Sequence, residues 1–418
     1  MTAFRTRGHA AAVAAVAAML RGHVPHAILL VGPRGIGKRT LAGDVAAGLL
    51  CTSADGAVRP CGTCRACRLV ASGGHPDVHR LAPDGAGRQV GIGGPGSAVR
   101  GVRDLIVELA LAPVEGGARV AIVRGAHRMN DDAQAALLKT LEEPGDGVVI
   151  ILCADVEEPI LPTIRSRSAR IRLGPVATRD IEALLTEAGA ADAPTAARLA
   201  RIAGGRPGVA MAWARQPDAL VAREQLARTI LDLSAARPSE RLAAMRAAIP
   251  LAAAVSAIDD ETPDGVAGSA ASASAPAGRS GRRATASRTP ASSTPNGEPS
   301  TAEATDPVDA ETAAPARASA AERRRAIEAI VSVWTDVARD LVVVARGMPA
   351  SARDIGLLDE TRGAAEQLDP AEVLRFLERL GRATTLLAGN VSPELVLDDL
   401  VLAWPRTSDA RRPVGSAS

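Results

Sequence analysis

The sequence predicts an α/β fold with a parallel sheet, followed by helical domains. Short apolar runs alternate with helical patterns through the first 175 residues. A glycine-rich phosphate loop, Gly32 to Lys38, follows one of these runs. From about residue 176 onward only helical patterns are found. Strands that alternate with helices are typical of a parallel sheet covered on both faces.

The N-terminal 175 residues contain five predicted strands and three predicted helices, each recognised from its apolar pattern. The strands are Ala27–Val31, Val78–Leu81, Arg119–Val123, Val148–Cys153 and Ala169–Leu173. The helices are Thr40–Leu50, Ala98–Ala112 and Asp132–Leu141. The stretch Met1–Ala18 is weakly apolar and has no convincing cleavage site. We therefore interpret it as an amphipathic helix rather than as a signal peptide.

Four segments are predicted after the α/β domain of residues 1–175. Residues 176–253 form a small helical domain, and residues 320–406 form a helical C-terminal domain. Between them, residues 254–319 are almost entirely small, polar and charged. Such a segment buries too little apolar surface to offset its chain entropy, so we expect a disordered insert there and a disordered tail at 407–418. The helices expected in these domains are Arg179–Ala188, Pro194–Ala203, Ala222–Leu233, Ala320–Arg346, Pro370–Leu387 and Ser392–Ala403.

The composition limits the classes of protein to which this chain can belong. Its 418 residues allow about two to four domains, and 47% hydrophobic residues are enough to build their cores. Tyr is absent and Phe occurs twice, so the core is expected to consist of Ala, Val, Leu and Ile. The net charge of +2 argues neither for nor against nucleic-acid binding. No stretch is long and apolar enough for a membrane span, so a cytoplasmic protein without a membrane partner is predicted.

The phosphate loop has the sequence context that its chemistry requires. Gly32, Gly35 and Gly37 permit a backbone that directs successive N–H groups at phosphate oxygens. The following helix adds its positive N-terminus, and Lys38, one of only two lysines in the chain, adds a point charge. The simpler alternative is a glycine-rich turn between a strand and a helix.

The same loop lacks the groups that hydrolyse a nucleotide. The position after the lysine, where a hydroxyl would bind Mg²⁺, is Arg39, and Thr40 is displaced by one residue. The strand Arg119–Val123 runs into Arg124-Gly125-Ala126-His127, without the carboxylates that would hold Mg²⁺ and activate water. We therefore expect a site that can bind ATP but does not hydrolyse it. Asp131 and Asp132 lie farther on and are interpreted as a helix N-cap.

Four of the five cysteines are clustered. Cys51 is followed by Cys61, Cys64 and Cys67, which form two consecutive C-x₂-C steps. Four thiolates at this spacing are typical of tetrahedral Zn²⁺ in a closed, structural site. An iron–sulfur cluster or free thiols are the alternatives. The fifth, Cys153, ends an apolar strand and is interpreted as a buried small hydrophobe.

Taken together, these motifs resemble those of the delta-prime and gamma/tau subunits of the bacterial DNA polymerase III clamp loader, members of the AAA+ family. The resemblance covers about residues 21–175 and follows the family's order. Its most specific element is the string Leu137-Leu138-Lys139-Thr140-Leu141-Glu142-Glu143-Pro144. The cysteine module at 51–67 precedes this string, and the stretch Leu161–Ser168 follows it. Gly389–Leu395 is similar to the family's last helical segment.

This resemblance implies an AAA+ domain, a lid formed by the small helical domain and a collar formed by the C-terminal helices. It implies that Arg167 is an arginine finger, because Ser166-Arg167-Ser168 occupies the place of the family's Ser-Arg-Cys motif. The arginine would reach the ATP of a neighbouring subunit. An ordinary surface arginine is the alternative. The implied partners are gamma/tau and delta subunits, the sliding clamp and primer–template DNA, the last held by the assembled complex.

Three departures from the family pattern favour the branch that does not hydrolyse ATP. They are Arg39, the acid-free stretch after the third strand, and Gly208, which stands where a nucleotide-sensing arginine is expected. The predicted function is therefore that of a delta-prime subunit, not catalytic by itself. An active gamma/tau-type ATPase that uses Thr40 is one alternative. A zinc-containing nucleic-acid-binding or scaffold protein is the other.

Overall fold

The computed structural model describes residues 3–84, 89–97, 99–115, 117–257, 319–389 and 391–407. Nearly all of the predicted disordered insert, and the predicted tail from residue 408, lie outside the described residues. Among the residues that are described, none of the helices combines the length and the apolar character needed to cross a membrane.

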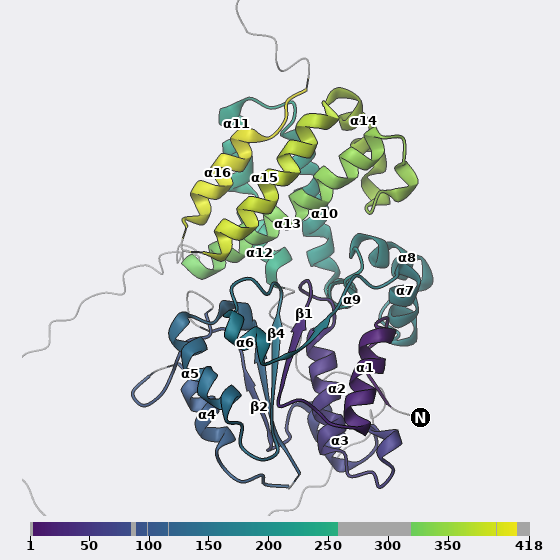
Figure 1. Cartoon of the computed structure of the whole chain (residues 1–418). Helices are drawn as coiled ribbons and strands as arrows, with labels where there is room; N and C mark the ends of the chain where they lie inside the picture. Colours follow the sequence, from purple (N-terminus) through teal and green to yellow (C-terminus); the bar gives the residue numbers. More distant parts are fainter. Residues whose placement is uncertain are drawn as a thin grey trace, which may run out of the picture. The chain divides into compact units, whose positions relative to one another are not determined.

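The N-terminal domain is built on one parallel sheet of five strands, in the order β2-β3-β4-β1-β5 (Figure 1). The strands are β1 (Ala27–Val31), β2 (Val78–Leu81), β3 (Arg119–Arg124), β4 (Val148–Ala154) and β5 (Ala169–Arg172). Every residue of β1 and β4 is buried, as expected for central strands covered on both faces. The predicted α/β fold with a parallel sheet is confirmed, and each strand end lies within one residue of its predicted position.

Helices cover both faces of this sheet. Apolar side chains of α1, α2 and α3 pack with Ile28 and Leu30 on one face. Those of α4, α5 and α6 pack with Ala27 and Leu29 on the other, so alternate residues of β1 serve two cores. The helices are α1 (Ala10–Arg21), α2 (Lys38–Leu50), α3 (Arg65–Ser72), α4 (Val102–Leu109), α5 (Asp131–Glu142) and α6 (Pro162–Ser166).

The chain before α1 differs from the sequence prediction. The expected helix within Met1–Ala18 begins only at Ala10. The extended segment before it is held by the buried carboxylate of Asp44 in α2, which accepts hydrogen bonds from the backbone N–H groups of Arg5 (3.1 Å) and Thr6 (2.9 Å). Gly8, with φ +73°, then turns the chain toward the helix. Tertiary hydrogen bonds therefore replace helical ones in this segment.

The helices after the sheet fall into two hydrophobic cores. Helices α7 to α9 pack around Ile181, Leu199 and Trp213. Helices α10 to α12 share a core with α13 to α16, across the insert in the sequence. The division between these cores lies near the start of α10, and the second core joins helices on both sides of residue 253. The helices are α7 (Thr178–Glu187), α8 (Ala193–Ile202), α9 (Pro207–Arg215), α10 (Pro217–Asp232), α11 (Pro238–Ala247), α12 (Ile249–Ala257), α13 (Ala320–Ala345), α14 (Leu358–Gln367), α15 (Pro370–Ala388) and α16 (Pro393–Ala403).

The second of these cores contains most of the chain's few aromatic residues. Trp334, Phe376 and Trp404 form a triangle with ring centroids 4.8–5.4 Å apart. All three are almost fully buried. The expectation of a core built only from aliphatic residues is therefore wrong for this part of the chain. Tilted and edge-on aromatic contacts add stabilisation beyond burial alone.

A buried ionic cluster joins α10 to α13 and to the loop that follows α13. The Arg223 guanidinium contacts Asp354 (Nη1–Oδ2 2.6 Å) and Asp336 (Nη2–Oδ2 3.5 Å) and stacks 5.5 Å from the Trp213 ring. Asp336 also pairs with Arg353 at 2.8 Å. The Arg223 side chain is 2% exposed. We call this group of charged residues the Arg223 cluster.

Candidate functional site

The phosphate loop, the stretch after β3 and the end of β4 meet at one edge of the sheet. In a parallel sheet the carboxyl ends of all strands lie at the same edge, and ligands bind there. Gly35 (φ +76°) and Gly37 (φ +111°) adopt backbone conformations that favour glycine, which explains two of the loop's three glycines. The loop ends at Lys38, the first residue of α2.

The Lys38 ammonium is held inside the domain. Its Nζ lies 2.8 Å from Asp155 Oδ1 and donates to the carbonyl oxygens of Pro33 (2.9 Å) and Gly32. The side chain is 9% exposed. A lysine with three acceptors in place is less available to a phosphate than an unpaired one. The geometry thus differs from that expected of a loop lysine directed only at a ligand.

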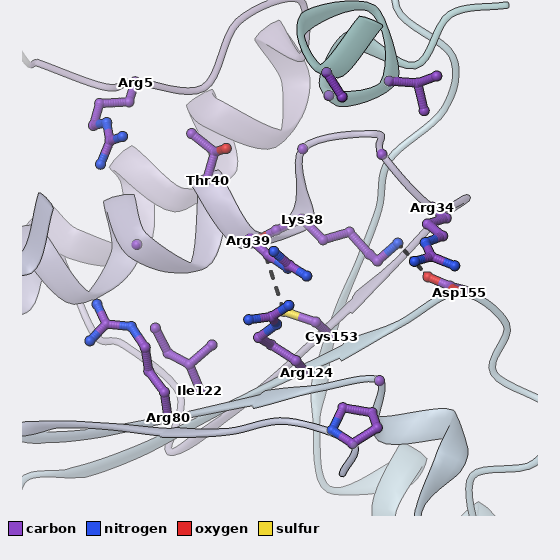
Figure 2. A pocket seen from close by; sticks show the side chains of 18 of the residues that line it. Arg5, Arg34, Lys38, Arg39, Thr40, Arg80, Ile122, Arg124, Cys153 and Asp155 are labelled. Carbon is purple, nitrogen blue, oxygen red and sulfur yellow. Dashed lines mark hydrogen bonds and ion pairs between the residues drawn. The ribbon is translucent and has the colours of Figure 1, made fainter. Parts of the chain in front are cut away.

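Asp155 is the functional candidate that the sequence analysis missed. It follows β4 directly and lines the same pocket as Lys38 (Figure 2). Burial alone would raise the pKa of this carboxyl, but attraction by Lys38 and His127 outweighs burial and holds the pKa below its ordinary value. The available signal was a carboxylate shortly after the predicted strand Val148–Cys153.

His127 lies on the other side of Asp155. Its Nδ1 accepts a hydrogen bond from the Asp155 backbone N–H at 3.1 Å, and its Nε2 lies 3.6 Å from Asp155 Oδ2. Burial lowers the pKa of the imidazole, partly offset by the Asp155 carboxylate. At neutral pH His127 is therefore a neutral hydrogen-bonding group that orients Asp155.

Two further residues singled out by the sequence, Thr40 and Gly208, also line this pocket. Thr40 lines the pocket but lies away from the Lys38–Asp155 pair (Figure 2). The backbone N–H of Gly208, at the start of α9, donates to the Gly35 carbonyl at 2.8 Å. A Cβ at residue 208 would meet that carbonyl oxygen at 2.9 Å. Helix α9 thus packs directly on the phosphate loop, and a larger side chain at 208 does not fit there.

One expectation about the neighbouring helix needs correction. The N-cap of α5 is Asn130, whose side chain accepts from the Ala133 backbone N–H at 2.9 Å. Asp131 and Asp132 lie in the first turn instead, where their charges favour the helix N-terminus.

The four clustered cysteines are brought together at the end of α2 and the start of α3. Their Sγ atoms all lie within 4.8 Å of one another. A tetrahedral zinc site with Zn–S bonds of about 2.3 Å needs S–S separations of about 3.8 Å, so the cluster can hold a metal ion with little adjustment. Backbone N–H groups point at the sulfurs: that of Cys64 contacts Cys61 Sγ at 3.4 Å, and that of Cys67 contacts Cys64 Sγ at 3.4 Å.

These N–H groups favour the thiolate form that binds metal. The backbone N–H groups of Cys64 and Thr63 lower the pKa of the Cys61 thiol to about 6. Burial raises the pKa of Cys67 instead. The fifth cysteine, Cys153, is 3% exposed at the end of β4, as predicted for a buried hydrophobe.

Arg167 lies at the opposite edge of the sheet from the phosphate loop. It follows α6 and precedes β5, whose first residue, Ala169, pairs with Ile28 near the start of β1. The length of β1 therefore separates Arg167 from the loop by more than about 13 Å. The Arg167 guanidinium is exposed, contacts Glu142 (Nη2–Oε1 3.0 Å) and donates to the Thr163 carbonyl at 3.2 Å. It does not line the pocket of Lys38.

Comparison with known proteins finds relatives that resemble part of this chain. Residues 9–177 match the model of the family described as DNA polymerase III, delta subunit. The DNA polymerase III subunit delta' of Pseudomonas aeruginosa is 42% identical over 147 residues, 35% of this chain and 42% of that protein. The Escherichia coli subunit delta' is 34% identical over 210 residues, 50% of this chain and 60% of that protein.

Gamma/tau proteins also match part of this chain. The DNA polymerase III subunit gamma/tau of Mycobacterium bovis is 34% identical over 164 residues, 39% of this chain and 27% of that protein. A gamma subunit-related protein from Thermotoga maritima aligns over 93% of this chain and 97% of its own, but with a TM-score of 0.36 and 15% identity, too little to support an argument. The chain thus spans about half the length of the curated delta' relatives. Through residues 9–177 the chain matches the family described as DNA polymerase III, delta subunit, and the chain is similar to delta' and gamma/tau subunits of the bacterial enzyme.

Proposed function

We propose that this chain acts as a delta-prime subunit: it presents Arg167 to the ATP of a neighbouring subunit and does not hydrolyse ATP itself. The position of Arg167 supports this most directly. It lies at the sheet edge opposite the chain's own phosphate loop, exposed and oriented by Glu142. If Arg167 acts on a nucleotide, that nucleotide is bound by another subunit, where the guanidinium would stabilise the charge that develops on the γ-phosphate.

The phosphate-loop pocket supports the second half of the proposal. Hydrolysis needs ligands for Mg²⁺ and a carboxylate that activates water. In this pocket, Arg39 and Arg124 occupy the corresponding positions, and Asp155 is engaged by Lys38. This arrangement of the described residues supports a site that does not hydrolyse ATP.

The experiment is steady-state ATP hydrolysis by a loader reconstituted with gamma/tau and delta partners, the sliding clamp and primed DNA. Arg167→Ala is expected to lower stimulated turnover at least about tenfold, because an arginine finger contributes factors of about 10³ or more at the site it serves. Arg167→Lys should restore little, because lysine lacks the planar fork. Arg179→Ala, which removes an exposed guanidinium on α7, serves as the matched control.

The outcome distinguishes a delta-prime subunit from a gamma/tau-type ATPase. Unchanged turnover with Arg167→Ala would refute the finger. Hydrolysis by the isolated chain, abolished by Lys38→Ala, would show a motor subunit instead.

We further propose that the cysteine cluster holds one structural Zn²⁺ ion. Four thiolates leave no open coordination position, so the metal would fix the segment between α2 and α3 and take no part in chemistry. Metal analysis of the purified chain should find about one zinc per chain, and Cys64→Ser should remove it. An iron–sulfur cluster would instead give visible absorption and iron in the same analysis.

The helices after the lid are proposed to form the collar contact with the partner subunits. The long helix α13 buries most of its apolar face within this chain. Exposed leucines remain on α15 and α16, namely Leu374, Leu386, Leu395 and Leu402. The contact surface is therefore expected on α15 and α16 rather than on α13, which the sequence analysis had included.

A further inference from the structure

The segment before α1 reaches both ends of α2. We call residues 3–9 the N-terminal strap. Helix α2 begins at the phosphate loop with Lys38 and ends next to Cys51 of the cysteine module, residues 51–67. Its 13 residues span about 18 Å at the usual rise of an α-helix. Seven residues of extended chain cover about 20 Å. The strap is therefore long enough to connect the cysteine module with the phosphate loop.

One end of the strap lies against the cysteine module. The backbone N–H of Ala3 donates to the Pro60 carbonyl at 2.7 Å, and Pro60 directly precedes Cys61. A Cβ at Gly62 would meet the Ala3 Cβ at 2.7 Å, so the two backbones approach closely. Phe4 is 7% exposed and belongs to the hydrophobic core that contains the apolar side chains of α3. The position of this end therefore depends on the backbone around the cysteines.

The middle of the strap is bound to the middle of α2. The Asp44 carboxylate accepts hydrogen bonds from the backbone N–H groups of Arg5 and Thr6, and the Thr6 hydroxyl donates to it at 2.6 Å. Asp44 is 2% exposed, so water has little access to replace these donors. A buried carboxylate without its donors is costly. These hydrogen bonds therefore fix the strap to the helix.

The other end of the strap contacts the phosphate loop. His9 Nε2 lies 2.8 Å from the Ile36 carbonyl oxygen. Because a carbonyl oxygen can only accept, the proton is on Nε2 and the imidazole donates. Ile36 lies between Gly35 and Gly37, the two glycines of the loop with φ values of +76° and +111°. His9 thus holds one peptide unit in the part of the loop that has the least common backbone conformation.

We infer that the N-terminal strap couples the cysteine module to the phosphate loop, so that metal binding by the four cysteines controls how rigidly the loop is held. The inference rests on the proposed zinc site and gives that site a role at the far end of α2. While the cysteines are held together, Pro60 and Gly62 keep Ala3 in place, and His9 keeps its contact with the loop. If the cysteines separate, this end of the strap loses its support. The hydrogen bonds farther along it should then open more often.

The test is hydrogen–deuterium exchange of the full chain, measured by mass spectrometry with zinc bound and after its removal by a chelator under reducing conditions. The readout is exchange in residues 32–41, which contain the phosphate loop. His9→Ala should accelerate this exchange about two- to tenfold with zinc bound, the effect of losing one hydrogen bond. His9→Gln keeps a donor and should restore most of the protection. His23→Ala, which removes an exposed imidazole, is the matched control.

The removal of zinc tests the coupling itself. In wild type it should accelerate exchange in residues 32–41 by a factor similar to that of His9→Ala. In His9→Ala the strap no longer contacts the loop, so zinc removal should cause no further acceleration there. Asp44→Asn, which replaces one accepting oxygen by an amide group, should behave in the same way.

Two results would overturn the coupling. Zinc removal that accelerates exchange in wild type only within residues 51–67 would show that the module acts locally. Equal acceleration of the loop in wild type and His9→Ala would show that α2, which joins the same two sites, transmits the effect.

Failure of the zinc proposal can be told apart from failure of the coupling. Metal analysis that finds no zinc would refute the zinc site and, with it, the coupling. A chain that holds zinc but whose loop does not respond to zinc removal would overturn the coupling alone. Neither result affects the Arg167 experiment on the reconstituted loader.

Discussion

Two cation–carboxylate groups among the described residues differ in their access to solvent. The Lys38–Asp155 pair lines a pocket, and the Asp155 side chain is 33% exposed. The Arg223 cluster lies between packed helices, and its Asp354 side chain is 8% exposed. Both contain short contacts between opposite charges. They differ in what surrounds the charges: one side of the pair faces a hollow, whereas Arg223 and its two carboxylate partners are enclosed by protein.

This difference assigns the two groups different roles. An enclosed charge that loses its partner has no water to replace it, so such a cluster contributes mainly to the integrity of the fold. A pair at the wall of a pocket can exchange its partner for water or a ligand at a modest cost. We therefore expect substitutions in the Arg223 cluster to change stability, and substitutions at the pair to change ligand binding more than stability.

The largest expected effect is that of Arg223→Ala. It leaves Asp354 and Asp336 buried without this partner, so the free energy of unfolding should fall by about 3–5 kcal/mol. Chemical denaturation monitored by Trp fluorescence measures this, because Trp213 lies against the Arg223 guanidinium. A loss below about 1 kcal/mol would show that the cluster is no more important than a surface ion pair. Arg179→Ala, on an exposed face, should change stability by less than about 0.5 kcal/mol.

The second effect concerns the contact between α9 and the phosphate loop. Gly208→Ala places a methyl group 2.9 Å from the Gly35 carbonyl oxygen, so the helix or the loop must shift, at a cost of about 1–3 kcal/mol. Gly363→Ala in α14 is the matched control, because a Cβ there meets nothing within 4 Å. That change should stabilise the chain by up to about 1 kcal/mol, since alanine favours a helix. Thermal unfolding of both variants should therefore show shifts of opposite sign, and shifts of the same sign would refute the close packing.

The third prediction distinguishes an effect on ligand binding from an effect on stability at the Lys38–Asp155 pair. Asp155→Asn removes the carboxylate while keeping its shape, and should lower the free energy of unfolding by only about 1 kcal/mol because the group is partly exposed. The same change raises the positive charge of the pocket, so ATP should bind more tightly than to wild type in isothermal titration. A stability loss as large as that of Arg223→Ala, with no gain in binding, would remove the distinction between the two groups.

The smallest expected effect is on the pH dependence of the stability difference between wild type and Asp155→Asn. Asp155 has a pKa below its ordinary value of 3.8 in the folded chain. A carboxyl of this kind stabilises the fold fully above its unfolded pKa, and the contribution is lost as the pH falls through the lower, folded pKa. The difference between wild type and Asp155→Asn should thus be constant near neutral pH and shrink below about pH 4. A difference that grows on acidification would mean that Asp155 is stabilised as the neutral acid.

Much of the sheet domain could be predicted because its signals are local. Strands such as Ala27–Val31 are unbroken apolar runs, and the loop that follows has its own glycine pattern. Helix α9 and the short α6 were not predicted, because a few residues after a proline carry too little periodicity. The packing of helices across residue 253 could not be predicted, for another reason. The core shared by α10 to α12 and α13 to α16 joins residues separated by the insert, and no local pattern records such a pairing.

The sequence by itself determined the chemical inventory: the glycines and Lys38 of the loop, the four cysteines, and the arginines where metal ligands are expected. These follow from residue type and spacing along the chain, which fix the possible chemistry. Only the tertiary structure decided that Asp155 engages Lys38, that α9 leaves no room for a side chain at Gly208, and that Arg167 lies across the sheet from the loop. Each of these depends on strand order and direction, which bring distant segments to a common edge or hold them at opposite edges.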